Sequence, residues 1–224
     1  MKPSVRINKR AFRLRPAFLL LALAAALPAF AYEYPLSPDA IRQAYFLGRK
    51  NADDVAKFLE TYTQRPPLPS AGPHVSLIWI ETPFVAVITH SRQMPNYSAP
   101  AAEKDFLGKP GMFRAHVQID LTPSYGWQLP SPAGTVRYRP DDFWRDFTVR
   151  LLQEDANSKN TAVSPLATRG KPIYTGDDGG SHLAGAQVDL EYDPEKIADA
   201  PAEIEVVTPD GQTVTVTFDL ATLR

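Results

Sequence analysis

Hydrophobic and polar residues alternate most regularly near the end of the chain. The alternation has a period of two over residues 187–192, 203–208 and 212–220, which is typical of strands that bury one face. The last two segments flank Asp210-Gly211, a dipeptide that is a strong signal for the tight turn of a β-hairpin. The pattern predicts three strands, of which the last two form a hairpin.

More strands are predicted earlier in the chain. Residues 75–81 form an almost continuous apolar run, which suits a strand covered on both faces, and residues 84–89 form another strand. Residues 113–119 and 143–152 alternate like the final strands, and a short strand at 173–174 lies within an otherwise polar stretch. About seven short strands separated by turn signals are typical of an antiparallel β-sandwich.

Two short helices are predicted ahead of the strands. Ser37 and Asn51 are good N-cap residues, and each precedes acidic residues in the first helical turn and apolar residues along one helical face. Because the gap between the two helices is short, they are expected to form an antiparallel hairpin. A third short helix is predicted over residues 98–106.

The order of these elements gives the predicted fold class. We expect a mainly β (α+β) chain, with a helical hairpin at residues 32–65, a proline-rich connector at 66–73 and an antiparallel, immunoglobulin-like β-sandwich at 74–224. The chain has no cysteine and so lacks the disulfide that links the sheets of true immunoglobulin domains. The likeness of the predicted sandwich to immunoglobulin domains therefore extends only to the outline of the fold.

The first 31 residues have the pattern of a cleavable signal peptide. A basic start is followed by an apolar run at residues 17–27 and by Ala29 and Ala31 at small-residue positions, so cleavage is expected before Tyr32. The apolar run is shorter than the ~20 residues that a transmembrane helix needs. We therefore expect an exported protein, periplasmic or secreted, with no integral membrane span after cleavage.

Removal of this segment changes the charge of the protein. Residues 1–31 hold six of the 24 Lys and Arg residues and none of the 25 Asp and Glu residues, so the formal net charge falls from −1 to −7. An acidic protein is a poor partner for nucleic acid or for an anionic membrane surface, since both attract positive charge. An envelope protein or a glycan is the expected partner.

No catalytic signature is present in the sequence. There is no Gly-x-Ser-x-Gly motif, no cysteine nucleophile and no pair of histidines at zinc-ligand spacing. His116 lies on the polar face of a predicted strand and is expected to face water. A hydrolase remains an alternative because a Ser-His-Asp site can assemble from distant residues, and Ser181-His182 follows an acidic loop. The sequence favours a protein that is not an enzyme.

Two loops contain candidate ligand-binding residues. Asp177 and Asp178 precede two glycines and could supply oxygen ligands to calcium, which is the one cofactor considered. Tyr125, Trp127 and Tyr138 lie in a loop rich in proline, where they stack on a sugar or anchor a partner protein if they are exposed. In the alternative interpretation, Trp127 packs under its own loop and fills one end of the sandwich. We expect a non-enzymatic binding or interaction protein of the envelope or secreted space, with a carbohydrate-binding module and a hydrolase as alternatives.

Overall fold

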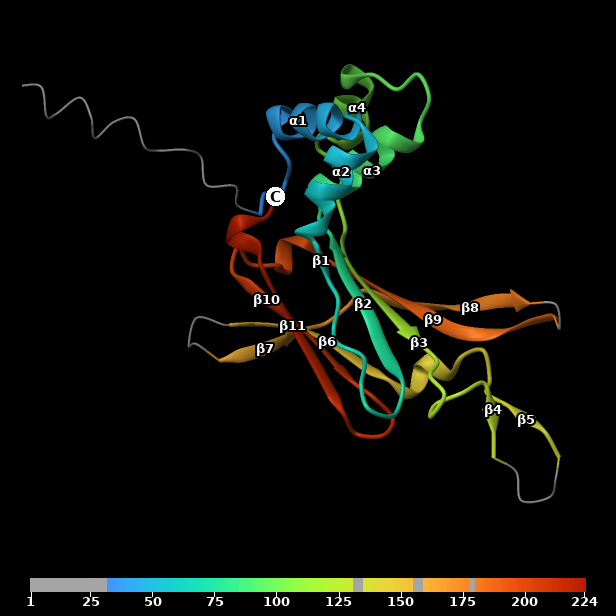
Figure 1. Cartoon of the computed structure of the whole chain (residues 1–224). Helices are drawn as coiled ribbons and strands as arrows, with labels where there is room; N and C mark the ends of the chain where they lie inside the picture. The colour runs from blue at the N-terminus through green and yellow to red at the C-terminus, as the bar shows by residue number, and fades with distance from the viewer. Residues whose placement is uncertain (1–31, 131–134, 155–158, 178–179) are drawn as a thin grey trace, which may run out of the picture.

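The computed structural model describes residues 32–130, 135–154, 159–177 and 180–224, and most of this part is antiparallel β-sheet (Figure 1). Four helices accompany the strands within the described residues, in agreement with the predicted α+β class. The predicted signal peptide at residues 1–31 lies outside the described part. In the part described, no helix combines the length and the apolar character that crossing a membrane requires.

Two large sheets contain most of the strands, and all neighbours within each sheet are antiparallel. The first has the order β1-β2-β3-β9-β8, with β1 at Thr63–Gln64, β2 at His74–Glu81, β3 at Phe113–Asp120, β9 at Gly180–Tyr192 and β8 at Ala167–Asp177. The second has the order β11-β10-β6-β7, with β11 at Thr213–Asp219, β10 at Pro201–Val207, β6 at Thr148–Glu154 and β7 at Asn160–Val163. A separate ribbon pairs β4 (Gln128–Leu129) with β5 (Arg137–Tyr138).

Both large sheets contribute side chains to one hydrophobic core. Val117 and Leu190 of the first sheet belong to the same buried cluster as Leu151 and Ile204 of the second. The predicted terminal hairpin is confirmed, because β10 pairs with β11 on either side of a turn in which Gly211 has a φ of +84°. Glycine adopts this backbone conformation without a steric cost.

The helices α1 (Pro38–Gly48) and α2 (Ala52–Glu60) begin where their caps predict. The Ser37 hydroxyl accepts a hydrogen bond from the Ala40 N–H at 3.2 Å, and Asn51 Oδ1 accepts one from the Asp54 N–H at 2.8 Å. These bonds satisfy backbone donors that a helix leaves unpaired at its start. The helix α4 (Ala99–Phe106) begins in the same way after Ser98, within the predicted segment.

The prediction of a strand at residues 84–89 is wrong, because this segment belongs to helix α3 (Pro83–Gln93). The Thr82 hydroxyl caps the helix by accepting a hydrogen bond from the Val85 N–H at 3.3 Å, and Pro83 occupies the first helical position. The residues that the helix buries recur at helical spacing and include Phe84, Val87, Ile88 and Ser91. The helix packs against α1, and all the helices lie together at one end of the sheets (Figure 1). This tertiary packing overrides the strand propensity of Val and Ile.

Two further segments differ from the prediction. Phe143–Asp146 forms a short 3₁₀ helix, so the strand predicted from residue 143 begins only at Thr148. In the polar stretch where only residues 173–174 were expected to form a strand, the chain forms β7 and the 11-residue β8. The strand β8 lies at a sheet edge and pairs with β9 through its backbone, so it needs no buried face of its own to be stable.

Candidate functional site

The aromatic ribbon β4–β5 meets the β8–β9 hairpin at one end of the molecule. The ring centroids of Trp127 and Tyr138 are 5.1 Å apart with an angle of 3° between their planes. Trp127 also stacks with His182, at 5.5 Å and 26°. The fold thus brings Trp127 and Tyr138, from the proline-rich loop, together with His182, which follows the acidic loop at Asp177.

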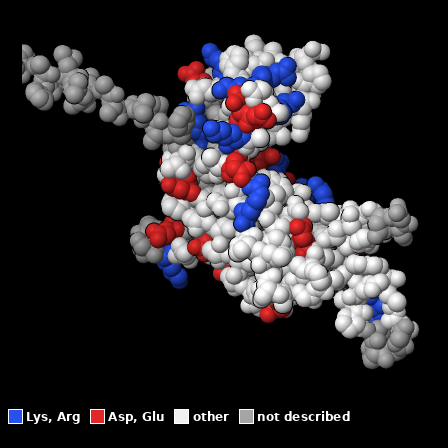
Figure 2. Space-filling view, in the orientation of Figure 1, with Lys and Arg blue, Asp and Glu red and all other residues white. Residues whose placement is uncertain are grey.

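These rings border a cavity of about 370 Å³, which we call the aromatic cleft. Its walls include Trp127, Tyr138, Asp141, Tyr174, Ser181 and His182. Tyr138 is 60% exposed and Tyr174 is 49% exposed, so both rings are accessible to a ligand. The β4–β5 ribbon projects from the body of the molecule, and the face of it seen in Figure 2 carries little charge.

Backbone pairing and one arginine hold the ribbon in place. Tyr138 lies opposite Gln128 in the ladder, and the Arg139 N–H donates a hydrogen bond to the Trp127 carbonyl at 2.7 Å. The Arg139 guanidinium lies 3.5 Å from the centroid of the Tyr125 ring, and its Nε donates to the Gly126 carbonyl at 3.0 Å. A cation over an aromatic face is a favourable contact.

Tyr125 does not line the aromatic cleft, unlike Trp127 and Tyr138. It is half-buried, and its ring centroid lies 6.4 Å from those of both Phe143 and Phe147 in the hydrophobic core. Burial raises the pKa of its hydroxyl. The structure therefore separates the three predicted binding residues into a packing residue, Tyr125, and a stacked pair in which Trp127 is half-buried and Tyr138 is exposed.

Polar groups stand beside the exposed rings. The nearby carboxylate of Asp141 raises the pKa of the Tyr174 hydroxyl, and both residues line the cleft. Arg139, whose guanidinium lies over Tyr125, also lines the cleft. An apolar ring face combined with charged hydrogen-bonding groups is the arrangement that a polar, ring-shaped ligand requires.

Ser181 and His182 also lie in the cleft, but their placement on β9 keeps them from forming a catalytic pair. They face Gly176 and Thr175 of β8 at successive positions of a regular ladder. Successive side chains of a strand point to opposite faces. Although the two residues are adjacent in the sequence, their side-chain functional groups are therefore not close together.

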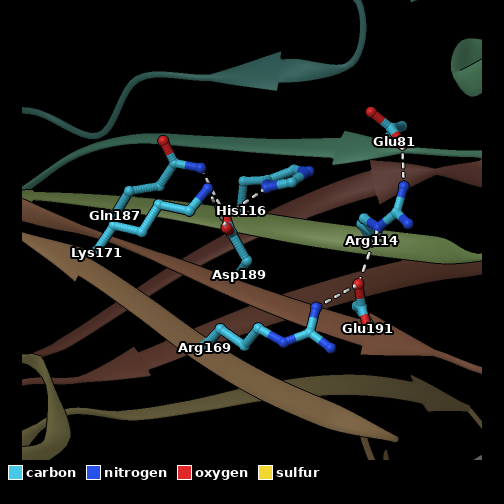
Figure 3. Close-up of polar contacts among 8 residues, drawn as sticks. All are labelled: Glu81, Arg114, His116, Arg169, Lys171, Gln187, Asp189 and Glu191. Atoms are coloured by element: carbon cyan, nitrogen blue, oxygen red, sulfur yellow. Dashed lines mark hydrogen bonds and ion pairs between the residues drawn. The ribbon is translucent and has the colours of Figure 1, made fainter. Parts of the chain in front are cut away.

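A second group of polar residues lies on the outer face of the five-stranded sheet (Figure 3). His116 Nδ1 is 2.7 Å from Asp189 Oδ1, and the His116 ring stacks on Trp79 with centroids 4.6 Å apart. The expectation that His116 faces water is wrong, because Trp79 and Asp189 cover it and leave it only 9% exposed. Gln187 donates to the same Asp189 oxygen at 2.6 Å, and Lys171 Nζ is 3.4 Å from the other.

This environment controls the charge of Asp189. Burial opposes ionisation of the carboxyl group, but the hydrogen bonds from His116 and Gln187 and the charge of Lys171 outweigh it and hold the pKa well below the usual value. His116 Nε2 is buried, and it has no hydrogen-bond partner among the described residues. Within the described residues, His116 thus has an orienting carboxylate at Nδ1 but no hydroxyl nucleophile at Nε2.

Next to this group, a chain of ion pairs crosses four strands (Figure 3). Arg114 of β3 lies between Glu81 of β2 and Glu191 of β9, with contacts of 2.6 and 3.3 Å. Glu191 is also 3.0 Å from Arg169 of β8. Because each carboxylate is already paired, we interpret this network as a connection between strands. This network was not identified from the sequence, since its pairing depends on the register of β3 against β9.

The predicted calcium ligands cannot be placed in a site. Asp178 and the side chain of Asp177 lie outside the described part of the chain.

A scan against protein-family models and a search of curated proteins both found no match to the sequence. Interpretation of the aromatic cleft therefore depends on its own geometry.

Proposed function

We propose that this chain is an exported, non-enzymatic protein that binds carbohydrate in the aromatic cleft. The observation that carries the proposal is the stack of Trp127 with Tyr138 and His182 beside Asp141. The signal-peptide pattern of residues 1–31 supports the proposal of export. A glycan of the envelope or of the surrounding medium is the partner that such a protein would meet.

The cleft has the chemistry that a sugar ring needs. The C–H groups on one face of a pyranose pack on an aromatic ring, and the exposed ring of Tyr138 supplies that face. Asp141 and Arg139 supply an acceptor and a donor for hydroxyl groups near the rim of the ring. The volume of about 370 Å³ lies within the range of about 300–1,000 Å³ that is typical of small-molecule sites.

The same geometry favours binding over hydrolysis. Ser181 and His182 occupy successive strand positions, and His116 lies on the outer sheet face beside Asp189 rather than on the cleft wall. Hydrolysis by a Ser-His-Asp site requires all three groups in one hydrogen-bonded chain. A ligand held in the cleft would contact ring faces and charged groups but no hydrogen-bonded Ser-His-Asp arrangement.

We infer further that the strands of residues 74–224 form an immunoglobulin-like β-sandwich with α3 and α4 inserted between β2 and β3, and that residues 32–65 form a helical hairpin joined to it by the connector at 66–73. The shared hydrophobic core of the two antiparallel sheets supports the sandwich. The short connection between α1 and α2 along the chain supports the hairpin, while α1 itself packs chiefly against α3 and α4. The sandwich would serve as the rigid support on which the cleft is built.

A glycan array followed by titration calorimetry tests the proposed binding. Tyr138→Ala is expected to weaken binding of the selected glycan by about tenfold or more, because the exposed stacking face is lost. Phe46→Ala is the matched control, since Phe46 is a similarly exposed ring (58%) on α1, outside the cleft. Absence of glycan binding by the unmodified protein, or binding that Tyr138→Ala leaves unchanged, contradicts the proposal.

A further inference from the structure

The two large sheets end in four edge strands within the described residues: β1, β8, β7 and β11. An edge strand exposes backbone N–H and C=O groups that can pair with another chain. Proteins suppress such pairing with short strands, prolines, lysines and bulges. The four edges differ in how many of these features they carry.

Three of the edges carry such protection. The strand β1 has two residues and is followed closely by Pro66, and β7 has four residues and is followed closely by Pro165. The strand β8 is long, but it contains Lys171 and Pro172, and its register shifts at Ile173. Each feature interrupts the row of backbone groups or places a charge on it.

The edge at β11 has none of these features. Its sequence, TVTVTFD, contains no proline, glycine, lysine or arginine, and all seven residues pair with β10 in an unbroken register. Among the described residues, no strand pairs with its outer edge. Thr213, Thr215 and Thr217 are exposed, whereas Val214 and Val216 are half-buried against the core.

We propose that β11 pairs in antiparallel fashion with β11 of a second copy of this chain. Centred on Val216, such pairing sets Thr215 opposite Thr217 and Val214 opposite Phe218, while Asp219 meets Thr213. Residues that lie opposite each other on paired strands point to the same face, so threonine meets threonine on the outside and apolar side chains meet over the core. No like charges oppose each other. The edge is complementary to itself, which is the condition for a two-fold interface.

An apolar cavity next to this edge adds surface for the second copy to cover. It has a volume of about 720 Å³ and is lined by Thr217 and Phe218 of β11 together with Leu47, Phe58 and Leu223. Strand pairing alone buries little apolar area, so an adjoining apolar surface strengthens the interface. Because the edge is used once by each copy, the assembly closes as a dimer and does not extend into a filament.

Sedimentation velocity over a series of protein concentrations tests this proposal. The unmodified protein is expected to show a monomer–dimer equilibrium, and Thr215→Lys is expected to weaken dimerisation by about tenfold or more, because it places two lysines close together across the two-fold axis. Thr175→Lys is the matched control, since it introduces the same change at an exposed position on the protected edge β8. This control is expected to leave the equilibrium unchanged.

Hydrogen exchange of the unmodified protein gives an independent measurement that needs no variant. Amide protection within residues 213–219 is expected to rise with protein concentration, while protection within β7 stays constant. A protein that remains monomeric at every concentration, or a dimer that Thr215→Lys does not weaken, overturns the proposal. Glycan binding by the aromatic cleft does not enter either measurement, so the two proposals fail independently.

Discussion

The indole ring of Trp144 lies directly against the backbone of Gly170. Trp144 precedes β6 of the four-stranded sheet and Gly170 belongs to β8 of the five-stranded sheet, so this contact connects the two sheets. A Cβ atom added to Gly170 would overlap the indole ring. The close approach therefore depends on the absence of a side chain at this position.

Gly170→Ala is expected to lower the free energy of unfolding by about 1–3 kcal/mol, because the indole must move to admit the methyl group. Urea unfolding measures the change. Gly176→Ala on the same strand is the control, since a Cβ at Gly176 meets no atom within 4 Å. Equal effects of the two substitutions would show that the packing of Trp144 does not matter.

The His116–Asp189 pair makes stability depend on pH in the acid range. The pKa of Asp189 in the folded protein lies below its ordinary value of 3.8, so its ionised form favours folding. This contribution is complete above pH 3.8 and is lost as the pH falls further toward the folded-state value. Asp189→Asn removes the titrating group and is expected to lower the free energy of unfolding near neutral pH by about 1–3 kcal/mol.

Unfolding at several pH values between neutrality and acid measures this effect. The loss of stability on acidification is expected to be smaller in Asp189→Asn than in the unmodified protein. Asp199→Asn, at an exposed carboxylate, provides the control and is expected to follow the unmodified protein. An acid dependence that stays the same in Asp189→Asn would mean that other carboxylates account for it.

The sequence predicted those elements whose signals are local. Ser37 and Asn51 marked the starts of two helices because a cap acts within three residues, and Asp210-Gly211 marked the hairpin because a turn is complete within four. The helix α3 was missed because its run of valine and isoleucine also suits a strand. The cap at Thr82 and the packing on α1 decided the outcome, and the second of these is not a local property.

The candidate site was predictable in part for the same reason. Trp127 and Tyr138 could be chosen from the sequence because aromatic residues are unusual in a loop rich in proline. Their stacking with His182 depends on where the β8–β9 hairpin lies relative to the ribbon, and no local pattern encodes that arrangement. The burial of His116 likewise depends on the pairing of three strands, which brings Trp79 and Asp189 to either side of it.

The cap of α3 is a buried hydroxyl group with two hydrogen-bond partners. Thr82 is fully buried, and its hydroxyl accepts a hydrogen bond from the Val85 N–H and donates one to the Arg224 carbonyl at 2.5 Å. It therefore connects the start of α3 with Arg224, which lies beyond the end of β11. Thr82→Ala removes both bonds in a place that water does not reach, so it is expected to lower the free energy of unfolding by about 1–3 kcal/mol.

Two comparison variants separate the hydroxyl from the methyl group of Thr82. Thr82→Ser keeps the hydroxyl and is expected to retain most of the stability, whereas Ser98→Ala removes the exposed cap of α4 and is expected to cost less than Thr82→Ala. Urea unfolding measures all three. If Thr82→Ser were as unstable as Thr82→Ala, packing of the methyl group would account for the loss. Stability that is retained in Thr82→Ser but lost in Thr82→Ala shows that the hydrogen bonds of this buried hydroxyl stabilise the start of α3.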